Sequence, residues 1–180
     1  MEQGLVEGFL GTVGHGFNRN YLFVIDYDTQ IIDFYSLNQD DETLADNLPP
    51  EQVVVILKFE PTDAEGNMPA VEFTIGNIPI LGVFDTGDHG TLTLTETLKT
   101  QLDQAGYLVT DDQDFLYGTY EPYLQGTLKK LQYGDQPLVD LHNLRLEIGD
   151  ENQLVLGYQF LKNYVTAWNY QDQTITLLKR

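Results

Sequence analysis

Two stretches of this 180-residue chain match one another and constrain its fold most strongly. NYLFVIDYDTQIIDFY at 20–35 and NYVTAWNYQDQTITLL at 163–178 align without gaps, every pair 143 positions apart (163 minus 20). Both are rich in β-branched and aromatic residues around a polar turn, which predicts two β-hairpins. An apolar-apolar-Gly precedes each copy, at 9–11 and at 155–157. We interpret the match as an internal duplication rather than a chance likeness of two hairpins. The identical pairs are Asn20 and Asn163, Tyr21 and Tyr164, Tyr27 and Tyr170, Gln30 and Gln173, and Ile32 and Ile175.

Short strands dominate the remaining pattern. Apolar, β-branched runs separated by turn residues predict strands at 53–61, 70–76 and 78–84, and further glycine-punctuated strands between 115 and 150. The sequence YQFLKNY at 158–164 predicts one short helical turn before the terminal hairpin. These features predict a mostly β fold.

One longer helix is expected at 95–105. Three leucines recur every four residues on its apolar side, at 94, 98 and 102. Thr93 and Glu96 have capping-box spacing, which places the N-cap at Thr93. Gly106 stands where the helix should end.

The chain divides into three parts. Residues 1–37 are interpreted as the tail of a preceding repeat or lobe, because the first hairpin copy lacks the segments that precede the second. Residues 38–52 are acidic, contain paired prolines and are expected to form a linker. Residues 53–180 are expected to form one complete lobe.

Composition excludes several classes of function. The net charge of -19 would repel nucleic acid and anionic membrane, so neither is an expected partner. No cysteine is present, which removes disulfides, thiolate zinc sites and cysteine nucleophiles. The three histidines are far apart in sequence, and we expect no metal and no cofactor. The start lacks the pattern of a signal peptide, and no apolar run is long enough to cross a bilayer. We expect a soluble chain of undetermined location, extracytoplasmic if a leader is removed.

The sequence VFDTGDHGTLTL at 83–94 carries the chemistry. Asp85 directly follows a buried strand, and Thr86 and Gly87 follow it. A strand end with a tight glycine turn holds a carboxylate in a fixed direction. By itself the motif is compatible with a catalytic carboxylate, a metal ligand or a polar Asx turn.

The context of that motif resembles the retropepsin-like (clan AA) aspartic proteases, in particular the bacterial type. The similar segments are AVEFTIGNIPILGVFDTG at 70–87, the helix after it, and LVLGYQFLKNYVTAWNYQDQTITL at 154–177. They follow the family's order through residues 53–180. The resemblance implies a closed, barrel-like β lobe with a ψ-shaped loop and one or two short helices. Residues 1–37 then resemble the end of a first lobe, which would make the chain the C-terminal half of a two-lobe protein.

The family implies a role for several positions. Asp85 would be catalytic, with Thr86, Gly87 and Asp88 forming the active loop. The apolar-Gly motif packed beneath this loop would be Val155, Leu156 and Gly157. A flap that covers the substrate would lie within 115–126, and its substrate-binding residues would be Gly118, Thr119, Tyr120 and Tyr123.

Peptide hydrolysis of this kind requires two carboxylates that share one proton. This chain has one Asp-Thr-Gly and no Asp-Ser-Gly, and Asp26 lacks the Thr-Gly that would make it the second. The second aspartate is therefore expected from another lobe, either an identical chain in a dimer or an N-terminal half. The expected partners are this second lobe and a polypeptide substrate.

Asp88 departs from the family pattern, in which a small residue follows the glycine. Three consequences are open: Asp88 raises the pKa of Asp85 by like-charge repulsion, it supplies a hydrogen-bond acceptor to the loop, or it marks a lobe that has lost catalysis. The alternative function is thus an inactive protease-like lobe that serves as a peptide-binding or assembly module. His89 is expected to be a solvated loop residue.

Overall fold

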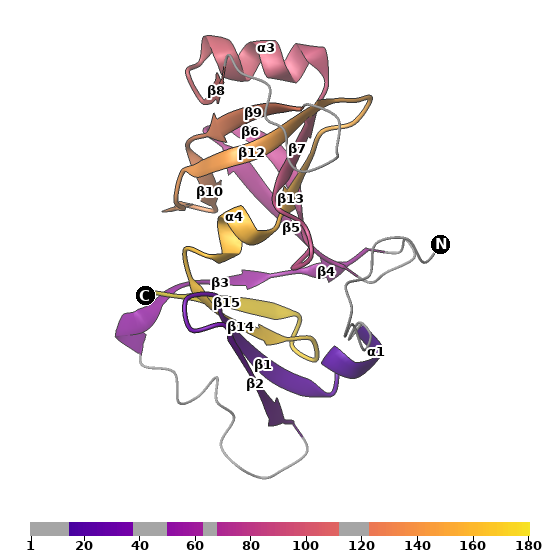
Figure 1. The fold of residues 1–180 in the computed structure, drawn as a ribbon, viewed down its shortest axis with the longest axis vertical. Helices are drawn as coiled ribbons and strands as arrows, with labels where there is room; N and C mark the ends of the chain where they lie inside the picture. Colours follow the sequence, from indigo (N-terminus) through magenta and orange to yellow (C-terminus); the bar gives the residue numbers. More distant parts are fainter. Residues whose placement is uncertain (1–14, 38–49, 63–67, 112–122) are drawn as a thin grey trace.

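The structure is a computed structural model that describes residues 15–37, 50–62, 68–111 and 123–180. Its described elements form two sheets, one of five strands and one of ten. In Figure 1 the smaller sheet lies below the larger, curled sheet, with α4 between them and α3 at the far end. The mostly β fold class predicted from the sequence is confirmed.

The five-stranded sheet has the order β2-β1-β14-β15-β3. It joins the two matching hairpins to the first strand of the lobe. Its strands and the two short helices beside it are α1 (His15–Asn18), β1 (Tyr21–Asp26), β2 (Ile31–Ser36), η1 (Pro50–Gln52), β3 (Val53–Lys58), β14 (Val165–Asn169) and β15 (Thr174–Leu178).

Strands β1 and β14 pair antiparallel at the centre of this sheet, and their register has two-fold symmetry. Val24 lies opposite Ala167, its own counterpart 143 positions on (167 minus 24). Adding or subtracting 143 converts the pair Leu22–Asn169 into the pair Val165–Asp26, which is also present. A local two-fold axis therefore passes between Val24 and Ala167.

The two hairpins also agree in local geometry. Gln30 and Gln173, which are counterparts, both have a left-handed backbone, with φ of 57° and 53°. Asp26 and its counterpart Asn169 both accept a backbone hydrogen bond from the residue two positions on, at 3.0 and 2.9 Å. Counterpart positions of the two hairpins therefore form the same turn.

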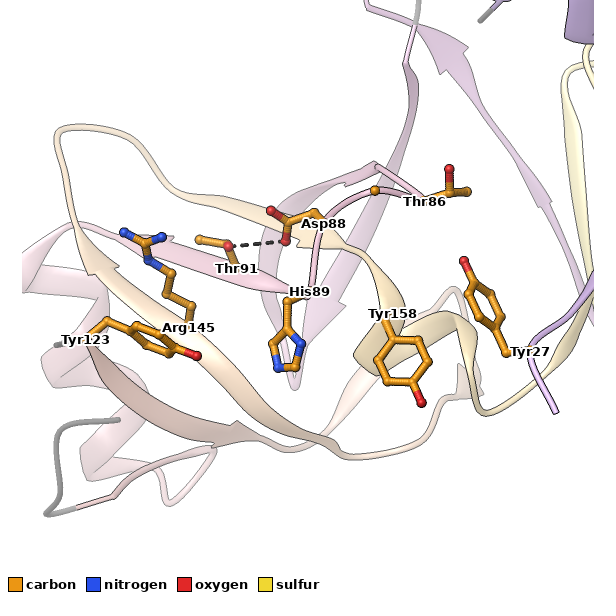
Figure 2. A pocket seen from close by; sticks show the side chains of 9 residues that line it. Tyr27, Thr86, Asp88, His89, Thr91, Tyr123, Arg145 and Tyr158 are labelled. Carbon is orange, nitrogen blue, oxygen red and sulfur yellow. Dashed lines mark hydrogen bonds between the residues drawn. The ribbon is translucent and has the colours of Figure 1, made fainter. Parts of the chain in front are cut away.

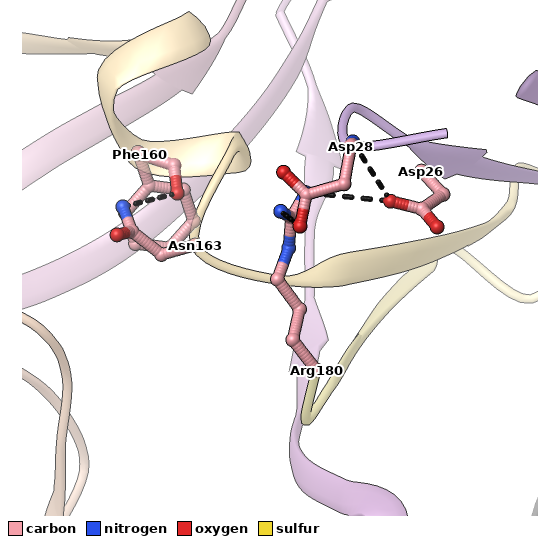
Figure 3. Close-up of polar contacts among 5 residues, drawn as sticks. All are labelled: Asp26, Asp28, Phe160, Asn163 and Arg180. Atoms are coloured by element: carbon pink, nitrogen blue, oxygen red, sulfur yellow. Dashed lines mark hydrogen bonds and ion pairs between the residues drawn. The ribbon is translucent and has the colours of Figure 1, made fainter. Parts of the chain in front are cut away.

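The segments before the hairpins match as well. The side-chain amide of Asn163 donates to the carbonyl of Phe160 at 3.0 Å (Figure 3), and that of Asn20 donates to the carbonyl of Phe17 at 3.2 Å. Each asparagine thus bonds the carbonyl of a residue in the short helix before its hairpin. The match between the copies begins before the first strand of each.

The C-terminal residue ties the first hairpin to the end of the chain. Arg180 forms ion pairs with Asp26, at 3.4 Å, and with Asp28 (Figure 3). The hydrogen bond from the Asp28 amide lowers the pKa of Asp26, and the Arg180 charge lowers it further. Asp26 is the last residue of β1 and Asp28 lies in the turn that follows, so this contact holds the turn beside the C-terminus.

The curled sheet has the order β11-β10-β5-β6-β13-β7-β12-β9-β8, with β4 paired to β5. Strand β13 lies between β6 and β7, parallel to the first and antiparallel to the second. Two strands that are consecutive in the chain are therefore separated by a third, which is the ψ-shaped arrangement. The elements are β4 (Glu60–Pro61), β5 (Pro69–Ile75), β6 (Ile78–Phe84), β7 (Thr91–Leu94), α3 (Glu96–Gln104), β8 (Leu108–Thr110), β9 (Leu124–Leu128), β10 (Leu131–Tyr133), β11 (Gln136–Pro137), β12 (Leu141–Ile148), β13 (Gln153–Leu156) and α4 (Tyr158–Leu161).

The helix predicted at 95–105 is confirmed as α3, but the prediction that Thr93 caps it is wrong. Thr95, not Thr93, is the N-cap, and its hydroxyl accepts from the Leu98 amide at 3.3 Å. Thr93 belongs to β7, whose pairing with β12 and β13 takes precedence over the capping-box spacing. Gly106 ends the helix with a φ of 69°, as expected. Most of the predicted linker lies outside the described residues, and Pro50–Gln52 forms η1.

Trp168 connects the two sheets. Its ring stacks on Phe23 of the first hairpin at 5.7 Å and meets Phe84, the last residue of β6, edge-on at 5.6 Å. Only 2% of its surface is exposed. The strand that leads to Asp85 therefore rests on an aromatic cluster shared by both hairpins.

We expect Trp168→Ala to lower the free energy of unfolding by about 3–5 kcal/mol, because truncating a buried aromatic loses burial and leaves a cavity. Chemical denaturation followed by far-ultraviolet circular dichroism measures the change. Ile148→Ala is the control: Ile148 is 50% exposed, and its truncation should cost less than about 0.5 kcal/mol. Equal losses in the two variants would contradict this role.

Candidate functional site

The end of β6 holds Asp85 next to the end of β13. The two strands run parallel, with Phe84 opposite Leu156. The Asp85 amide donates to the Leu156 carbonyl at 3.4 Å, so the ladder reaches the aspartate itself. Residues 85 and 157 are thereby brought to one place although 72 positions separate them (157 minus 85).

The loop after β6 is held by its own carboxylates. Oδ1 of Asp85 accepts from the Gly87 amide at 2.8 Å, and the Asp85 carbonyl accepts from the Asp88 amide at 3.2 Å. Asp85 is half-buried, and Thr86 and Gly87 are exposed. One carboxylate oxygen of Asp85 is therefore held by the Gly87 amide, whereas Thr86 and Gly87 themselves face outward.

Asp88 turns its side chain into the loop. Its Oδ1 accepts from the Gly90 amide at 2.6 Å and from the Thr91 hydroxyl at 3.3 Å (Figure 2). Of the consequences that the sequence left open, the geometry shows the hydrogen-bond acceptor. The carboxylate closes the turn that returns the chain to β7.

The predicted apolar-Gly motif lies under this loop. Leu156 is fully buried, Val155 is half-buried, and the Gly157 backbone packs against Asp88. A Cβ on Gly157 would lie 2.2 Å from the Asp88 carbonyl oxygen. The same carbonyl accepts from the Tyr158 amide at 2.9 Å. Only glycine allows the two backbones to approach this closely.

Gly157→Ala should therefore displace the loop of residues 85–90 and lower the free energy of unfolding by about 1–3 kcal/mol, the usual cost of overpacking. Denaturation measures the cost, and amide chemical shifts of residues 85–90 report the displacement. Gly16→Ala is the matched control, since a Cβ added to Gly16 would meet nothing within 4 Å. Unchanged loop shifts in Gly157→Ala would refute the packing argument.

A cavity of about 410 Å³ opens beside the loop (Figure 2). Asp85 is not among the described residues that line it, but the four residues that follow Asp85 all line it. The lining combines aromatic rings with few charges. It consists of Tyr27, Thr86, Gly87, Asp88, His89, Thr91, Tyr123, Arg145 and Tyr158.

Two of these residues lie at the end of the cavity next to Thr91, away from Tyr27 and Tyr158 (Figure 2). Tyr123, which the sequence assigned to substrate binding, lines the cavity, and the Arg145 guanidinium lies 5.4 Å from the centre of its ring. Arg145 also pairs with Glu147 at 2.9 Å. Sequence reasoning missed Arg145, because its position on β12 becomes part of the cavity only through the pairing of β12 with β7. Gly118, Thr119 and Tyr120 lie outside the described residues.

His89 is exposed, as expected, but it has neighbours. Its Nε2 lies 2.8 Å from Nε2 of Gln159 and 3.2 Å from the carbonyl of Asn143. Lys162 donates to Oε1 of Gln159 at 2.6 Å. The His89 side chain therefore links the loop of residues 85–90 to Gln159 of α4.

Tyr27 lines the cavity, although the sequence pattern does not indicate this position. It lies in the turn of the first hairpin, and its ring meets Tyr158 edge-on at 5.5 Å. Burial raises the pKa of the Tyr27 hydroxyl, and the nearby charges of Asp85 and Tyr158 raise it further. The segment interpreted as the tail of another lobe thus contributes a side chain to the cavity beside Asp85. In the sequence, Tyr27 is notable only because its counterpart Tyr170 is also a tyrosine. That match indicates a duplication and does not indicate a position in the cavity.

This pKa shift predicts an alkaline effect. A tyrosine whose pKa is raised above 10.0 in the folded state contributes stability that is complete below about pH 10 and is lost as the pH rises through the folded pKa. Tyr27→Phe should make the free energy of unfolding fall less steeply above about pH 10, and should remove one late-titrating phenol from the tyrosinate absorbance. The pKa of Tyr164 and of Tyr170 is also raised by burial, so part of the slope should persist. Identical slopes in variant and parent would contradict the assignment.

Neither a metal-binding cluster of side chains nor a membrane-spanning helix is found among the described residues. No group of three or more His, Cys, Asp or Glu side chains there is arranged to hold a metal ion. Within the same residues no helix has the length and apolarity needed to span a membrane.

Comparison with known proteins gives a distant likeness. A crystal structure of a retropepsin-like aspartic protease from Rickettsia conorii matches with a TM-score of 0.42 and 18% sequence identity, over 69% of this chain and 89% of that chain. No family model matches the chain, and no curated protein matches it. The fold class therefore rests on the strand order, and the activity is a proposal.

Proposed function

We propose that this lobe is one half of an aspartic endopeptidase, in which Asp85 is one of two catalytic aspartates. The observation that carries the proposal is the fixed position of Asp85. It stands at the end of β6, bonded to the Gly87 amide at 2.8 Å, in a loop whose next residues line a cavity. The Asp-Thr-Gly motif, the ψ-shaped strand order and the Gly157 contact support the same function.

The reaction follows from a pair of carboxylates at close range. Like charges a few ångströms apart do not both ionise, so the pair shares one proton; aspartic proteases are the standard case of this coupling. The ionised member takes a proton from a water molecule, and the protonated member polarises the peptide carbonyl. In this lobe the Gly87 amide would hold Asp85 in position for either role.

A second lobe supplies the other carboxylate in this proposal, because the sequence contains one Asp-Thr-Gly. Thr86 is exposed at the edge of the loop, where a residue that hydrogen-bonds to a second lobe is expected. The local two-fold axis between Val24 and Ala167 supports a partner related to this lobe by rotation.

The substrate class we propose is an extended polypeptide. Such a chain binds as a strand, through backbone hydrogen bonds and pockets for alternate side chains. The cavity offers aromatic walls from Tyr27, Tyr123 and Tyr158. We propose, as the sequence predicts, that Gly118, Thr119 and Tyr120 belong to a flap that covers the substrate.

Asp85→Asn tests the proposal. The test uses a tandem chain in which residues 50–162 are followed directly by residues 20–180. Asn20 is the counterpart of residue 163, so the joint preserves the order of the segments, and the tandem chain carries Asp85 twice. We expect acid-optimal, pepstatin-sensitive cleavage of a denatured protein by this chain. Asp85→Asn in either copy should lower the rate by about 10²–10⁴-fold, the usual contribution of an acid–base group.

Asp150→Asn is the matched control, because Asp150 is an exposed loop aspartate and its replacement should leave the rate unchanged. Cleavage that survives Asp85→Asn would refute the catalytic assignment. Peptide binding without turnover by a folded tandem chain at every pH would instead support the alternative, a non-catalytic binding module.

A further inference from the structure

Arg145 brings a positive charge to the cavity, and its backbone is held on both sides. On β12 it lies opposite Thr91 of β7 and opposite Gln125 of β9. Its amide donates to the Gly90 carbonyl at 3.0 Å. The arginine is therefore attached to the loop of residues 85–90, at the end of the cavity next to Thr91 (Figure 2).

The guanidinium of Arg145 is oriented but only partly engaged. It lies 5.4 Å from the centre of the Tyr123 ring, and its Nε lies 2.9 Å from Oε1 of Glu147. The side chains of this ion pair are 49% and 41% exposed, and a pair so exposed contributes little to stability. Glu147 is the one ionic partner of Arg145 in the described part of the chain. The donors on the two terminal nitrogens of the guanidinium are then open to a ligand.

The acid that shares the cavity does not neutralise this charge. Among the described lining residues Asp88 is the one carboxylate and Arg145 the one guanidinium. Oδ1 of Asp88 accepts from the Gly90 amide at 2.6 Å and from the Thr91 hydroxyl at 3.3 Å. Asp88 therefore serves the loop, and the counter-ion of Arg145 is Glu147, which does not line the cavity.

We propose that Arg145 gives the cavity a preference for polypeptides with a glutamate or aspartate side chain, whose carboxylate takes the place of Glu147 on the guanidinium. The planar fork of arginine matches both oxygens of a carboxylate, and the face of Tyr123 stabilises the cation. Calling this polypeptide a substrate rests on the proposed function; the preference for a carboxylate rests on the surroundings of Arg145 alone.

The charge of the whole chain limits the preference to a single acidic side chain. The net charge of -19 repels an acidic polypeptide at long range. Salt at about 0.15 M screens exposed charges beyond about 8 Å, whereas the contact with Arg145 is direct. The expected ligand is therefore one acidic residue within an otherwise neutral, extended segment.

Peptide titration of the full 180-residue chain tests this preference. The probes are acetyl-Ala-Ala-Glu-Ala-Ala-amide and the same peptide with Gln in place of Glu, at about pH 6.5, where a glutamate is ionised. Amide chemical shifts of Thr91, Arg145 and residues 85–90 report binding. The Glu peptide should bind about three- to tenfold more tightly, the range for an exposed charge-assisted contact.

Four variants assign the preference to Arg145. Arg145→Gln should bring the ratio of the two affinities to about one, and Arg145→Lys, which keeps the charge without the fork, should give an intermediate ratio. Arg19→Gln is the matched control, because Arg19 is exposed and is not among the described lining residues. Glu147→Gln should raise the ratio by removing the competing carboxylate, an effect that a purely structural Arg145 would not produce. Circular dichroism checks that each variant folds.

Equal affinities for the Glu and Gln peptides, or no binding of either, would overturn the proposal. A ratio that neither Arg145 variant changes would also overturn it. If acetyl-penta-alanine with a free C-terminal carboxylate binds as tightly as the Glu peptide, the cavity takes a chain end, and the assignment to an acidic side chain is wrong.

The preference and the proposed catalysis fail or succeed separately. Asp85→Asn in the full chain should leave the affinity ratio unchanged, because Arg145 does not contact Asp85 through any ion pair or hydrogen bond of the described residues. A tandem chain that cleaves protein but binds Glu and Gln peptides alike would refute the preference and leave the catalytic proposal intact.

Discussion

The position of strand β13 between β6 and β7 determines the geometry of the whole site. Because β13 is hydrogen-bonded to both, the chain that leaves β6 must loop over the end of β13 before it returns as β7. Asp85 and Asp88 are in this loop, and Gly157 is directly beneath it. A side chain larger than hydrogen at 157 would separate the loop from the strand end. Consequently the sheet topology, more than any local preference, decides where the carboxylate of Asp85 lies.

The same dependence extends to the first hairpin. Phe23 stacks on Trp168, and Trp168 supports Phe84 at the end of β6. Through Tyr27 the hairpin also reaches the cavity. Residues 15–37 therefore contribute to the cavity beside Asp85. The pairing of β1 with β14 sets the two-fold axis and also places Tyr27 near Asp85.

Much of this arrangement could be read from the sequence, for identifiable physical reasons. Period-two patterns and turn residues located both hairpins, and the leucines at 94, 98 and 102 are all buried around α3. The two matching stretches, 143 residues apart, form equivalent turns in the structure. The counterparts Gln30 and Gln173 both have a left-handed backbone there. Local patterns were enough wherever local chemistry decides the conformation. They failed where long-range pairing decides: Thr93 looked like a helix cap, but β7 needs it as a strand residue. Arg145 and Tyr27 entered the cavity through strand pairings that no local pattern encodes.

The loop hydrogen bonds have a consequence for how a second lobe would act. Oδ1 of Asp85 is bonded to the Gly87 amide, and Asp88 closes the turn through the Gly90 amide. Both bonds form within this lobe, so the loop is ordered without help from a partner. In the proposed function, a partner would then have to supply a second carboxylate but would not have to order the loop that carries Asp85. Such preorganisation reduces the conformational entropy lost on association and leaves the interaction energy for positioning the two aspartates. Asp88, which departs from the small residue expected after the glycine, is thereby compatible with a working loop.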